Sequence, residues 1–478
     1  MCGISGGIGN IKTCKEEIFA MSKSLNHRGP DDIGFYSNEN VILNHNRLSI
    51  IDLTKKGSQP MMSFDGRFVI IFNGEIYNYI EILKNLGIYS NNKGDTRALV
   101  EIFSKRKINC LENLRGMFSF VILDKKLKKI YLVRDRYGIK PLYYYRRPDI
   151  FFYSSEIKPL IKFVKNLKPN SKIIKEYLNY SLVDHSRETF FENVFQVMPG
   201  EYIEVNFKGE ITGKKKWYKL KDKINLGINE IKKSHINYVE EFSSIFEETM
   251  KIHSRSDVDI GLSISGGLDS QAILSELINR KKYKSINTYN FYFFNKKYSE
   301  KEKVKKLLKK TNVKENYILF KSNFFEKIKK NIKIQEQPFG GVATMAMQSL
   351  YSKARSDGLK VLLNGSGADD YMSGSNREIL YFLVELHQQN KFEKLNYEIE
   401  HYCKNYSINK KLLLKKLNNL TSNFYSLGAD GTSYLNNRFL NSEAKLKKKM
   451  FNHNKPSLKK ILIDRITKNK LPRNLRYE

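Results

Sequence analysis

One segment in the second half of this chain limits its fold more than any other. Residues 259–264 are mostly apolar and read as a buried strand, residues 265–270 form a glycine-rich turn, and helical periodicity begins at Ser270. Further apolar strands at 285–294 and 360–364 alternate with helical segments. Strands that alternate with helices predict a doubly wound parallel sheet, so this half is expected to be an α/β domain.

The first half of the chain has a different pattern. Short apolar segments that read as strands lie at 41–43, 68–72, 118–123 and 130–133, and helical periodicity occurs at 16–25 and 95–106. Strands interspersed with helices indicate a layered α+β domain. A chain of 478 residues is long enough for two such domains. We predict a first domain at 1–207, a connection rich in Lys and Gly at 208–234, and a second domain at 235–478.

The net charge of +34, from 84 Lys and Arg against 50 Asp and Glu, raises the question of a nucleic-acid partner. The lysines are scattered among Asn, Ile and Tyr, and the densest runs, at 214–216 and 447–449, are short. No RNA-recognition aromatic motif or helix-turn-helix pattern stands out. We therefore predict no nucleic-acid partner.

The composition also bears on the compartment. No run of about 18 apolar residues is present, so no membrane span is predicted. The first ten residues have neither a basic nor an apolar region typical of a signal peptide. The four cysteines show no metal-ligand spacing, and a disulfide framework is not expected in a chain of this size. These features favour the cytoplasm.

Cys2 is the first residue with chemical potential. Removal of Met1 would leave a cysteine with a free α-amine, whose pKa of about 8 lets it act as a base near neutral pH. A thiol beside such an amine can become a nucleophile. On its own, Cys2 could equally be an ordinary small residue after the initiator methionine.

Four sequence blocks follow Cys2 within the first hundred residues. They are His27-Arg28-Gly29-Pro30-Asp31, Arg47-Leu48-Ser49-Ile50-Ile51-Asp52, Asn73-Gly74-Glu75-Ile76-Tyr77-Asn78 and Gly94-Asp95-Thr96. In this order they resemble the class II glutamine amidotransferases, which are N-terminal-nucleophile hydrolases. The resemblance implies a four-layer α+β domain with Cys2 as the nucleophile. The family often has Ser where this chain has Gly94.

Glutamine chemistry explains the residue types in these blocks. Arg47 can pair with the α-carboxylate of glutamine, and Glu75 and Asp95 can receive its ammonium group. The side-chain amide of Asn73 and the backbone N–H of Gly74 can stabilise the oxyanion of the tetrahedral intermediate. The resemblance extends the glutamine site to Leu48, Ser49, Ile50 and Ile51.

The glycine-rich turn of the second half suits a phosphate group. Backbone N–H groups between a strand and a helix attract an anion, and the hydroxyls of Ser265 and Ser270 add donors beside Gly266 and Gly267. Asp269 is expected to hold Mg²⁺ that bridges phosphates. The turn is not a Walker A loop. Ser-Gly-Gly-Leu-Asp-Ser is similar to the signature of the ATP-pyrophosphatases, which cleave ATP between its α- and β-phosphates.

A second glycine-rich turn follows the strand at 360–364. Its residues Asn364-Gly365-Ser366-Gly367-Ala368-Asp369-Asp370 resemble a block of the asparagine synthetases. The resemblance implies that Asp369 is a second Mg²⁺ ligand and that Asn364 and Gly365 contact the nucleotide. Ile264 and Phe291 are expected to line the adenine site, and residues 336–341 to lie near the acceptor pocket.

The combined resemblance covers nearly the whole chain and implies a glutamine-hydrolysing asparagine synthetase that uses ATP and Mg²⁺. Cys2 would release ammonia from glutamine, and the second domain would convert the side chain of aspartate to an acyl-adenylate. Ammonia would then pass through an interior tunnel and displace AMP. A homodimer is also implied.

Two departures from the family leave alternatives open. Ser366 stands where relatives often carry Glu, Asp or Gln, and Asp370 stands where Glu is usual. Relatives also continue beyond a stretch similar to 475–478, so we expect the chain to be truncated. It could amidate another carboxylate, such as a uronic acid, or be a glutaminase remnant without synthetase activity.

Overall fold

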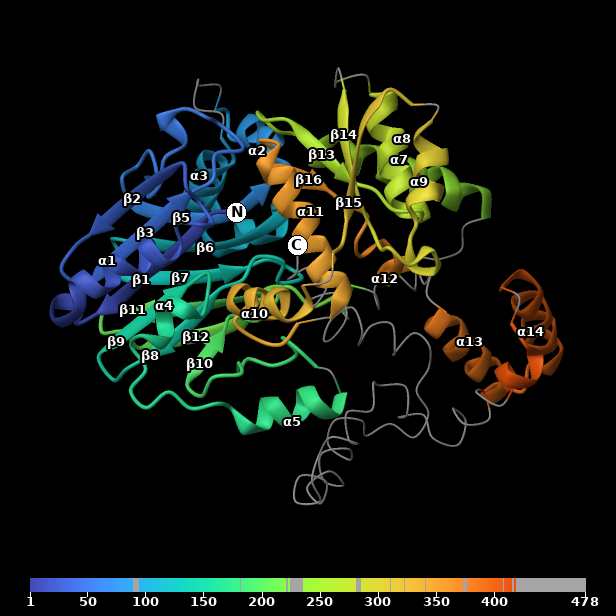
Figure 1. The fold of residues 1–478 in the computed structure, drawn as a ribbon. Coiled ribbons are helices and arrows are strands. Elements are labelled where there is room, and N and C mark those ends of the chain that lie inside the picture. The colour runs from blue at the N-terminus through green and yellow to red at the C-terminus, as the bar shows by residue number, and fades with distance from the viewer. Residues whose placement is uncertain are drawn as a thin grey trace. The chain divides into compact units, whose positions relative to one another are not determined.

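The computed structural model describes residues 1–88, 94–180, 182–220, 222–223, 235–280, 285–309, 311–321, 323–339, 341–372, 376–406, 408–414 and 417 (Figure 1). The chain forms two compact units. Among the described residues, the first unit comprises Met1–Leu167 and Asn193–Ser366, and the second comprises Lys168–Glu192 and the residues from Gly367 onward. The boundaries predicted at 207 and 235 stay a prediction.

Two antiparallel sheets, each of six strands, form the first half of the first unit. One sheet has the order β10-β8-β9-β1-β3-β2, with β1 at Gly3–Gly9, β2 at Asp32–Ser37, β3 at Val41–Arg47, β8 at Tyr143–Arg146, β9 at Ile150–Ser154 and β10 at Val194–Gln196. The other has the order β12-β11-β7-β6-β5-β4, with β4 at Met61–Met62, β5 at Phe68–Ile76, β6 at Gly116–Asp124, β7 at Lys129–Arg134, β11 at Glu201–Asn206 and β12 at Ile211–Lys216.

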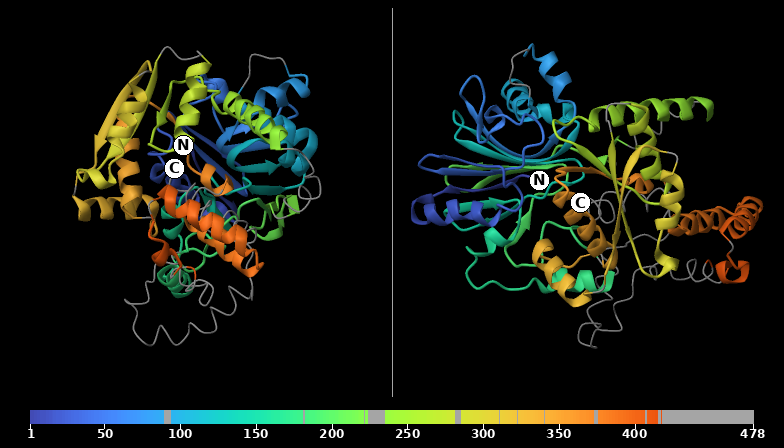
Figure 2. Two further views of the ribbon diagram at one scale, coloured as in Figure 1. Left: turned by 90° about the vertical axis from the view of Figure 1, so that its right-hand side faces the viewer. Right: turned by 45° about the horizontal axis from the view of Figure 1, so that its top comes forward.

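These sheets stack face to face and are covered by helices on their outer sides (Figure 2). Helix α1 (Lys15–Ser24) packs on β1 and β3, and helix α3 (Asp95–Arg106) packs on β5. Strand β5 is apolar from Phe68 to Phe72 because both of its faces are buried. Its even-numbered residues from Phe68 to Phe72 face α3, whereas Val69 and Ile71 face the core between the sheets. The predicted four-layer α+β domain is confirmed.

Part of the predicted connection at 208–234 is a strand of the second sheet. Residues 211–216 form β12, which pairs with β11, and Trp217 donates from Nε1 to the carbonyl oxygen of Arg134 at 3.1 Å. Strand β12 lies at the edge of its sheet and is exposed or half-buried throughout. Such a strand can be rich in Lys and Gly, so its sequence looks like a linker. Residues 224–234 lie outside the described part of the chain.

A parallel sheet of four strands follows, in the order β15-β14-β13-β16. The strands are β13 (Ile260–Ser263), β14 (Ile286–Tyr292), β15 (Val313–Leu319) and β16 (Val361–Leu363). One face packs on α7 (His235–His253), α8 (Leu268–Asn279) and α9 (Lys301–Leu308), and the other on α11 (Val342–Ser356). The predicted α/β domain is confirmed.

The strand order reverses between β13 and β16, because β14 and β15 extend the sheet on one side of β13 and β16 joins the other side. Open α/β sheets bind ligands at such a point, beyond the carboxyl ends of the strands. The two predicted glycine-rich turns directly follow β13 and β16. The topology therefore brings both turns to the place where a nucleotide is expected.

The remaining elements are shorter or belong to the second unit. In the first unit lie α2 (Tyr79–Asn85), α4 (Lys158–Ile161), α10 (Phe324–Gln335) and the 3-10 helices η1 (Ile11–Cys14), η2 (Lys55–Gly57), η3 (Lys107–Asn113) and η4 (Lys296–Tyr298). The second unit contains α5 (Ser171–Tyr180), α12 (Ala368–Met372), α13 (Asn376–Gln388) and α14 (Phe392–Tyr406). No helix among the described residues has both the length and the hydropathy that a membrane crossing requires.

Candidate active sites

The thiol of Cys2 lies at one end of the stacked sheets, just before β1. Gly3 pairs with Asn46 at the end of β3, and this register brings Cys2 beside the residues that follow that strand. The backbone N–H of Leu48 points at the Cys2 Sγ atom, with the two heavy atoms 3.4 Å apart. The predicted nucleophile therefore contacts the predicted glutamine-binding segment directly.

The end of strand β5 and the start of helix α3 lie next to each other in space. Asn73, Gly74 and Glu75 lie in the last part of β5, and Asp95 is the first residue of α3. The Asp95 carboxylate accepts a hydrogen bond from the backbone N–H of Ile76 at 3.2 Å, which joins the two elements. The long-range pairing of strands thus unites residues that are spread over more than ninety positions of the sequence.

Asn73 has the environment expected of an oxyanion-binding group. Its side chain is fully buried, and neither atom of its amide has a hydrogen-bond partner among the described residues. Buried amides nearly always have a hydrogen-bond partner, so the Asn73 amide is expected to bind a group that does not belong to the chain, such as a substrate. Gly74 passes so close to β6 that a Cβ atom would lie 2.1 Å from the carbonyl oxygen of Met117. Only glycine fits there.

Burial dominates the electrostatics of this site. Burial, together with the neighbouring Glu75, raises the pKa of Asp95 to about 7. Burial also raises the pKa of Glu75, against the opposing effect of Lys140, and that of the Cys2 thiol, against the opposing effect of the N-terminal amine. A cationic ammonium group placed between Glu75 and Asp95 would relieve this accumulation of buried acidic groups.

Arg47 is held by the turn that follows β3. Its Nη1 atom donates to the carbonyl oxygen of Thr54 at 2.9 Å, and Nη2 donates to that of Asp52. A Cβ atom at Gly57 would lie 2.1 Å from Nη2, so this position must be glycine for the guanidinium to fit. These bonds use two of the five N–H donors of a guanidinium.

The other predicted glutamine-binding residues lie in the same turn and are half-buried: Leu48, Ser49, Ile50 and Ile51. The backbone N–H of Ser49 donates to the carboxylate of Asp31 at 2.8 Å. The carbonyl oxygen of Ile50 accepts from the backbone N–H of Asp257 at 3.1 Å. The turn is therefore braced from the residues that precede β13.

The turn after β13 is arranged to receive an anion. The hydroxyl of Ser270 accepts from the backbone N–H of Ser265 at 3.1 Å, and the hydroxyl of Ser265 accepts from that of Gly267 at 3.2 Å. The backbone N–H of Gly266 donates to the carboxylate of Glu300 at 3.0 Å. A negatively charged oxygen therefore already binds this turn in the folded chain.

The second glycine-rich turn lies against the first. A Cβ atom at Gly365 would be 2.9 Å from both the Asp269 Cβ atom and the Ser270 backbone nitrogen. Asn364 accepts the backbone N–H of Ser366 at 2.9 Å and so shapes its own turn. The predicted nucleotide-binding residues that follow β13 and β16 are thus brought together.

Ile264 and Phe291, which are predicted to line the adenine site, lie on opposite faces of the parallel sheet. The Ile264 side chain is buried in the core between the sheet and α8, its backbone N–H donates to the carbonyl oxygen of Tyr289 at 2.9 Å, and its carbonyl oxygen accepts from the Asn290 amide at 2.9 Å. Position alone could not show this, because Ile264 lies one residue beyond the end of β13. Phe291 is half-buried on the other face of the sheet, where it packs edge-on against Phe293. Asp369 lies in α12 of the second unit.

Two family models match the chain: the glutamine amidotransferase domain over residues 1–218 and asparagine synthase over residues 241–474. A protein of Methanocaldococcus jannaschii, provisionally named as a glutamine-hydrolysing asparagine synthetase, is 31% identical over 398 residues, which cover 78% of this chain and 75% of that protein. The chain belongs to the glutamine-hydrolysing asparagine synthetase family. This is a family of glutamine-dependent ligases that use ATP.

Other relatives differ in length and name. A glutamine-hydrolysing asparagine synthetase of Bacillus subtilis is 29% identical over 385 residues, which cover 79% of this chain but 59% of that protein. An amidase of Gibberella zeae is 31% identical over 295 residues, which cover 57% of this chain and 42% of that protein. Membership of this family therefore does not by itself fix the acceptor.

Three residues of the first site were not singled out in the sequence. Arg28 donates to the carbonyl oxygen of Cys2 at 3.0 Å, and it belongs to the sequence block at 27–31. Lys140 is buried 2.9 Å from the Met1 Sδ atom, and burial lowers its pKa to about 8. Glu156 pairs with Arg28 at 2.9 Å. No local pattern marks Lys140 or Glu156, because only the fold brings them to Cys2.

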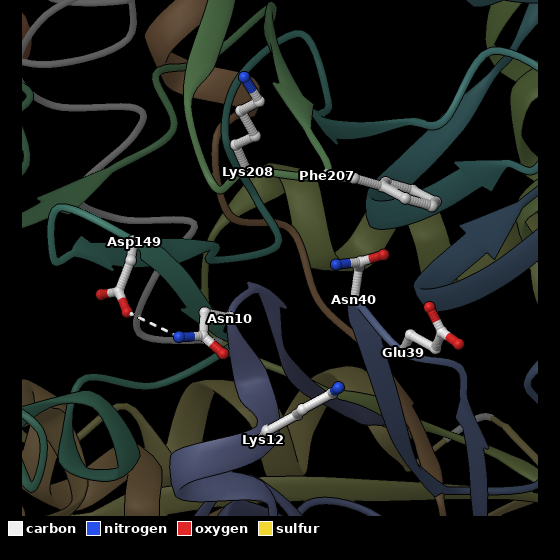
Figure 3. A pocket seen from close by; sticks show the side chains of 7 residues that line it. All are labelled: Asn10, Lys12, Glu39, Asn40, Asp149, Phe207 and Lys208. Atoms are coloured by element: carbon white, nitrogen blue, oxygen red, sulfur yellow. Dashed lines mark hydrogen bonds between the residues drawn. The ribbon is translucent and has the colours of Figure 1, made fainter.

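A polar hollow of about 420 Å³ lies at the opposite end of β1 (Figure 3). It is lined by Asn10, Lys12, Glu39, Asn40, Asp149, Phe207 and Lys208. Asn10 donates to Asp149 across it at 3.4 Å. None of the predicted site residues line it.

Proposed function

We propose that this chain transfers ammonia from glutamine to an adenylated aspartate, giving asparagine, glutamate, AMP and pyrophosphate. One observation carries the proposal. A single chain holds a thiol against the predicted glutamine-binding segment and a fully buried asparagine amide that has no hydrogen-bond partner among the described residues, and also two glycine-rich turns in contact at the switch point of a parallel sheet. The first arrangement suits acyl transfer and the second suits a nucleotide.

The glutaminase step follows from the first arrangement. After removal of Met1, the α-amine of Cys2 takes the thiol proton, and the sulfur attacks the side-chain amide carbon of glutamine. The Asn73 amide and the Gly74 N–H hold the oxyanion, and the proton passes to the departing ammonia. Water then hydrolyses the thioester to glutamate. Arg47 binds the substrate carboxylate, and Glu75 and Asp95 bind its ammonium.

The synthetase step uses the second arrangement. We propose that Ser265, Gly266, Gly267 and Ser270 bind the phosphates of ATP and that Asn364, Gly365 and Phe291 contact the nucleoside, while Ile264 anchors the turn that follows β13. Asp269 fits a role as a Mg²⁺ ligand, because it supplies carboxylate oxygens in the first turn of α8, where the second glycine-rich turn packs against it. The sequence pattern assigns Asp369 the same role. A Mg²⁺ ion held by these carboxylates would supply positive charge to the phosphates of ATP.

A second candidate acceptor is another small carboxylate, such as a uronic acid. Ser366 at a position where relatives often carry an acidic residue or Gln, and the similarity to an amidase, favour this candidate. A third candidate is a chain that hydrolyses glutamine only. In all three cases the reaction is proposed to occur in the cytoplasm between small molecules, and the homodimer stays a prediction.

Pyrophosphate release tests the proposal. The purified protein is mixed with Mg-ATP and glutamine, with and without aspartate, and glutamate is measured in parallel. Aspartate-dependent pyrophosphate supports asparagine synthesis. Glutamate without pyrophosphate contradicts it and leads to a panel of other carboxylates. A Cys2→Ala variant supplied with ammonia serves as the control, because it should lose glutamine-dependent but not ammonia-dependent release.

A further inference from the structure

A buried chain of charged groups leads away from Cys2. Arg28 donates from Nε to the carbonyl oxygen of Cys2 at 3.0 Å and from Nη1 to Oε1 of Glu156 at 2.9 Å. The side chains of Arg28 and Glu156 are each only 9% exposed. One guanidinium thus joins the backbone of the predicted nucleophile to a carboxylate that is more than a hundred residues away in sequence.

Glu156 is surrounded by cationic groups. Its Oε1 atom also lies 2.9 Å from Nε2 of His27, and its Oε2 atom lies 2.8 Å from Nζ of Lys158. Burial would raise the pKa of Glu156, but His27, Arg28 and Lys158 hold it well below its usual range. The carboxylate therefore stays ionised although it is buried, and its two oxygens serve different partners.

A second buried carboxylate shares Lys158. Glu336 accepts the backbone N–H groups of Ile157 at 2.6 Å and of Lys158 at 2.7 Å, and its Oε1 atom lies 3.7 Å from the Lys158 ammonium. Glu336 adopts a left-handed backbone conformation at the end of α10 and is 8% exposed. It begins the segment 336–341, which was predicted to lie near the acceptor; Gly340 is outside the described residues.

The two buried carboxylates share one ammonium group, that of Lys158, whose side chain is 32% exposed. If Glu336 moves away from the backbone N–H groups of Ile157 and Lys158, Lys158 can pair with Glu156 alone. The interaction between Glu156 and Arg28 then changes. Interactions within such a buried network are coupled, and the removal of one member alters the others. All of these residues lie in the first unit.

We infer that Glu156 is a positioning residue for Cys2, because it keeps Arg28 in its hydrogen bond to the Cys2 carbonyl oxygen. Since Lys158 pairs with both Glu156 and Glu336, the strength of this positioning depends on where the Glu336 carboxylate lies. This inference rests on the proposed hydrolysis of glutamine at Cys2. Glu156 does not contact the reacting atoms. Its effect is on the orientation of the nucleophile, so it should alter kcat more than KM, since Arg47 and Asp95 hold the substrate.

Two measurements on Glu156→Gln test the first part. The rate of Cys2 alkylation by iodoacetamide, followed by mass spectrometry of the N-terminal peptide, should fall about tenfold. The kcat for glutamate formation should fall by a similar factor, with KM within about twofold. Glu156→Asp should recover part of both rates. Glu204→Gln is the matched control, because Glu204 is a partly buried carboxylate that pairs with Lys129 at 3.2 Å on another sheet.

A double-mutant cycle tests the second part. Glu336→Gln should change the alkylation rate in the wild-type background but not in the Lys158→Met background, where the shared ammonium is gone and the backbone donors remain. If circular dichroism shows that Glu156→Gln does not fold, Lys158→Met replaces it in the alkylation and kcat measurements. An equal effect of Glu336→Gln in both backgrounds overturns the coupling.

The outcomes separate the inference from the proposed function. Unchanged alkylation and kcat in Glu156→Gln, with an active wild type, overturn the inference alone. A wild type that forms no glutamate, but whose Cys2 alkylation depends on Glu156, contradicts the proposed function and supports the inference.

Discussion

The ammonium group of Lys360 lies 2.6 Å from Oδ2 of Asp31, the same oxygen that accepts the backbone N–H of Ser49. Lys360 directly precedes β16, the strand that ends at the turn of Asn364 and Gly365. One salt bridge therefore joins the proposed glutamine-binding turn to the start of a strand that leads into the proposed nucleotide site.

Removal of this salt bridge should weaken glutamine binding. In Lys360→Met, Asp31 loses a partner and the turn at Ser49 is less well held, so we expect the KM for glutamine to rise about threefold to tenfold with little change in kcat. Both side chains are partly exposed, so the free energy of unfolding should fall by no more than about 1 kcal/mol. Steady-state kinetics at low and high salt check this. A KM equal to that of the wild type at low salt contradicts the prediction.

Asn73→Ala should separate activity from stability. The Asn73 amide has no partner among the described residues, so its loss should not lower the melting temperature, while kcat for glutamine hydrolysis should fall about a hundredfold or more. Asn44→Ala is the control. The Asn44 amide donates to the carbonyl oxygen of Ile18 at 2.7 Å, so this variant should lose about 1–3 kcal/mol of stability. A large stability loss in Asn73→Ala would show that this amide has a structural role.

Asp95 should make both stability and glutamine binding depend on pH. Burial and the neighbouring Glu75 raise its pKa in the folded state to about 7, from an ordinary value of 3.8. Between these values the folded state binds more protons, so Asp95 makes the protein less stable as pH rises from about 4 to 7. Asp95→Asn should remove that contribution. The measurement is the melting temperature from pH 5 to 8, compared between wild type and variant.

The substrate acts on Asp95 in the opposite direction. The ammonium of glutamine favours ionised Asp95, so KM for glutamine should fall as pH rises from 6 to 8 in the wild type. Asp95→Asn should show a higher KM without this trend. The same slope in both proteins would assign the pH dependence to another group.

Gly365→Ala should affect only the nucleotide site. The added Cβ would lie 2.9 Å from both the Asp269 Cβ atom and the Ser270 nitrogen, so the two turns must separate. We expect ATP affinity to fall at least about tenfold, with glutamate formation unchanged. Gly213→Ala is the matched control, because its Cβ would meet nothing closer than 3.6 Å. ATP binding by calorimetry distinguishes the two variants, and equal affinities would contradict the prediction.

Local patterns in the sequence predicted much of the fold and the proposed site. Helix α3 begins and ends at the predicted residues, because its apolar residues recur at helical spacing. Cys2, Arg47, Asn73 and Asp95 were predicted from short blocks, and the structure brings them to one end of the stacked sheets. These features are readable because each depends on a few neighbouring residues.

Other features depend on contacts between distant segments, and only the tertiary structure decided them. Strand β12 could not be recognised, because an edge strand with little burial has the composition of a linker. Glu156 and Lys140 have no local signature, since their roles arise from partners more than a hundred residues away. The sequence by itself determined the family to which the chain belongs. The pairing of distant strands decided which charged groups surround Cys2, because burial and charge at a site are properties of the whole fold.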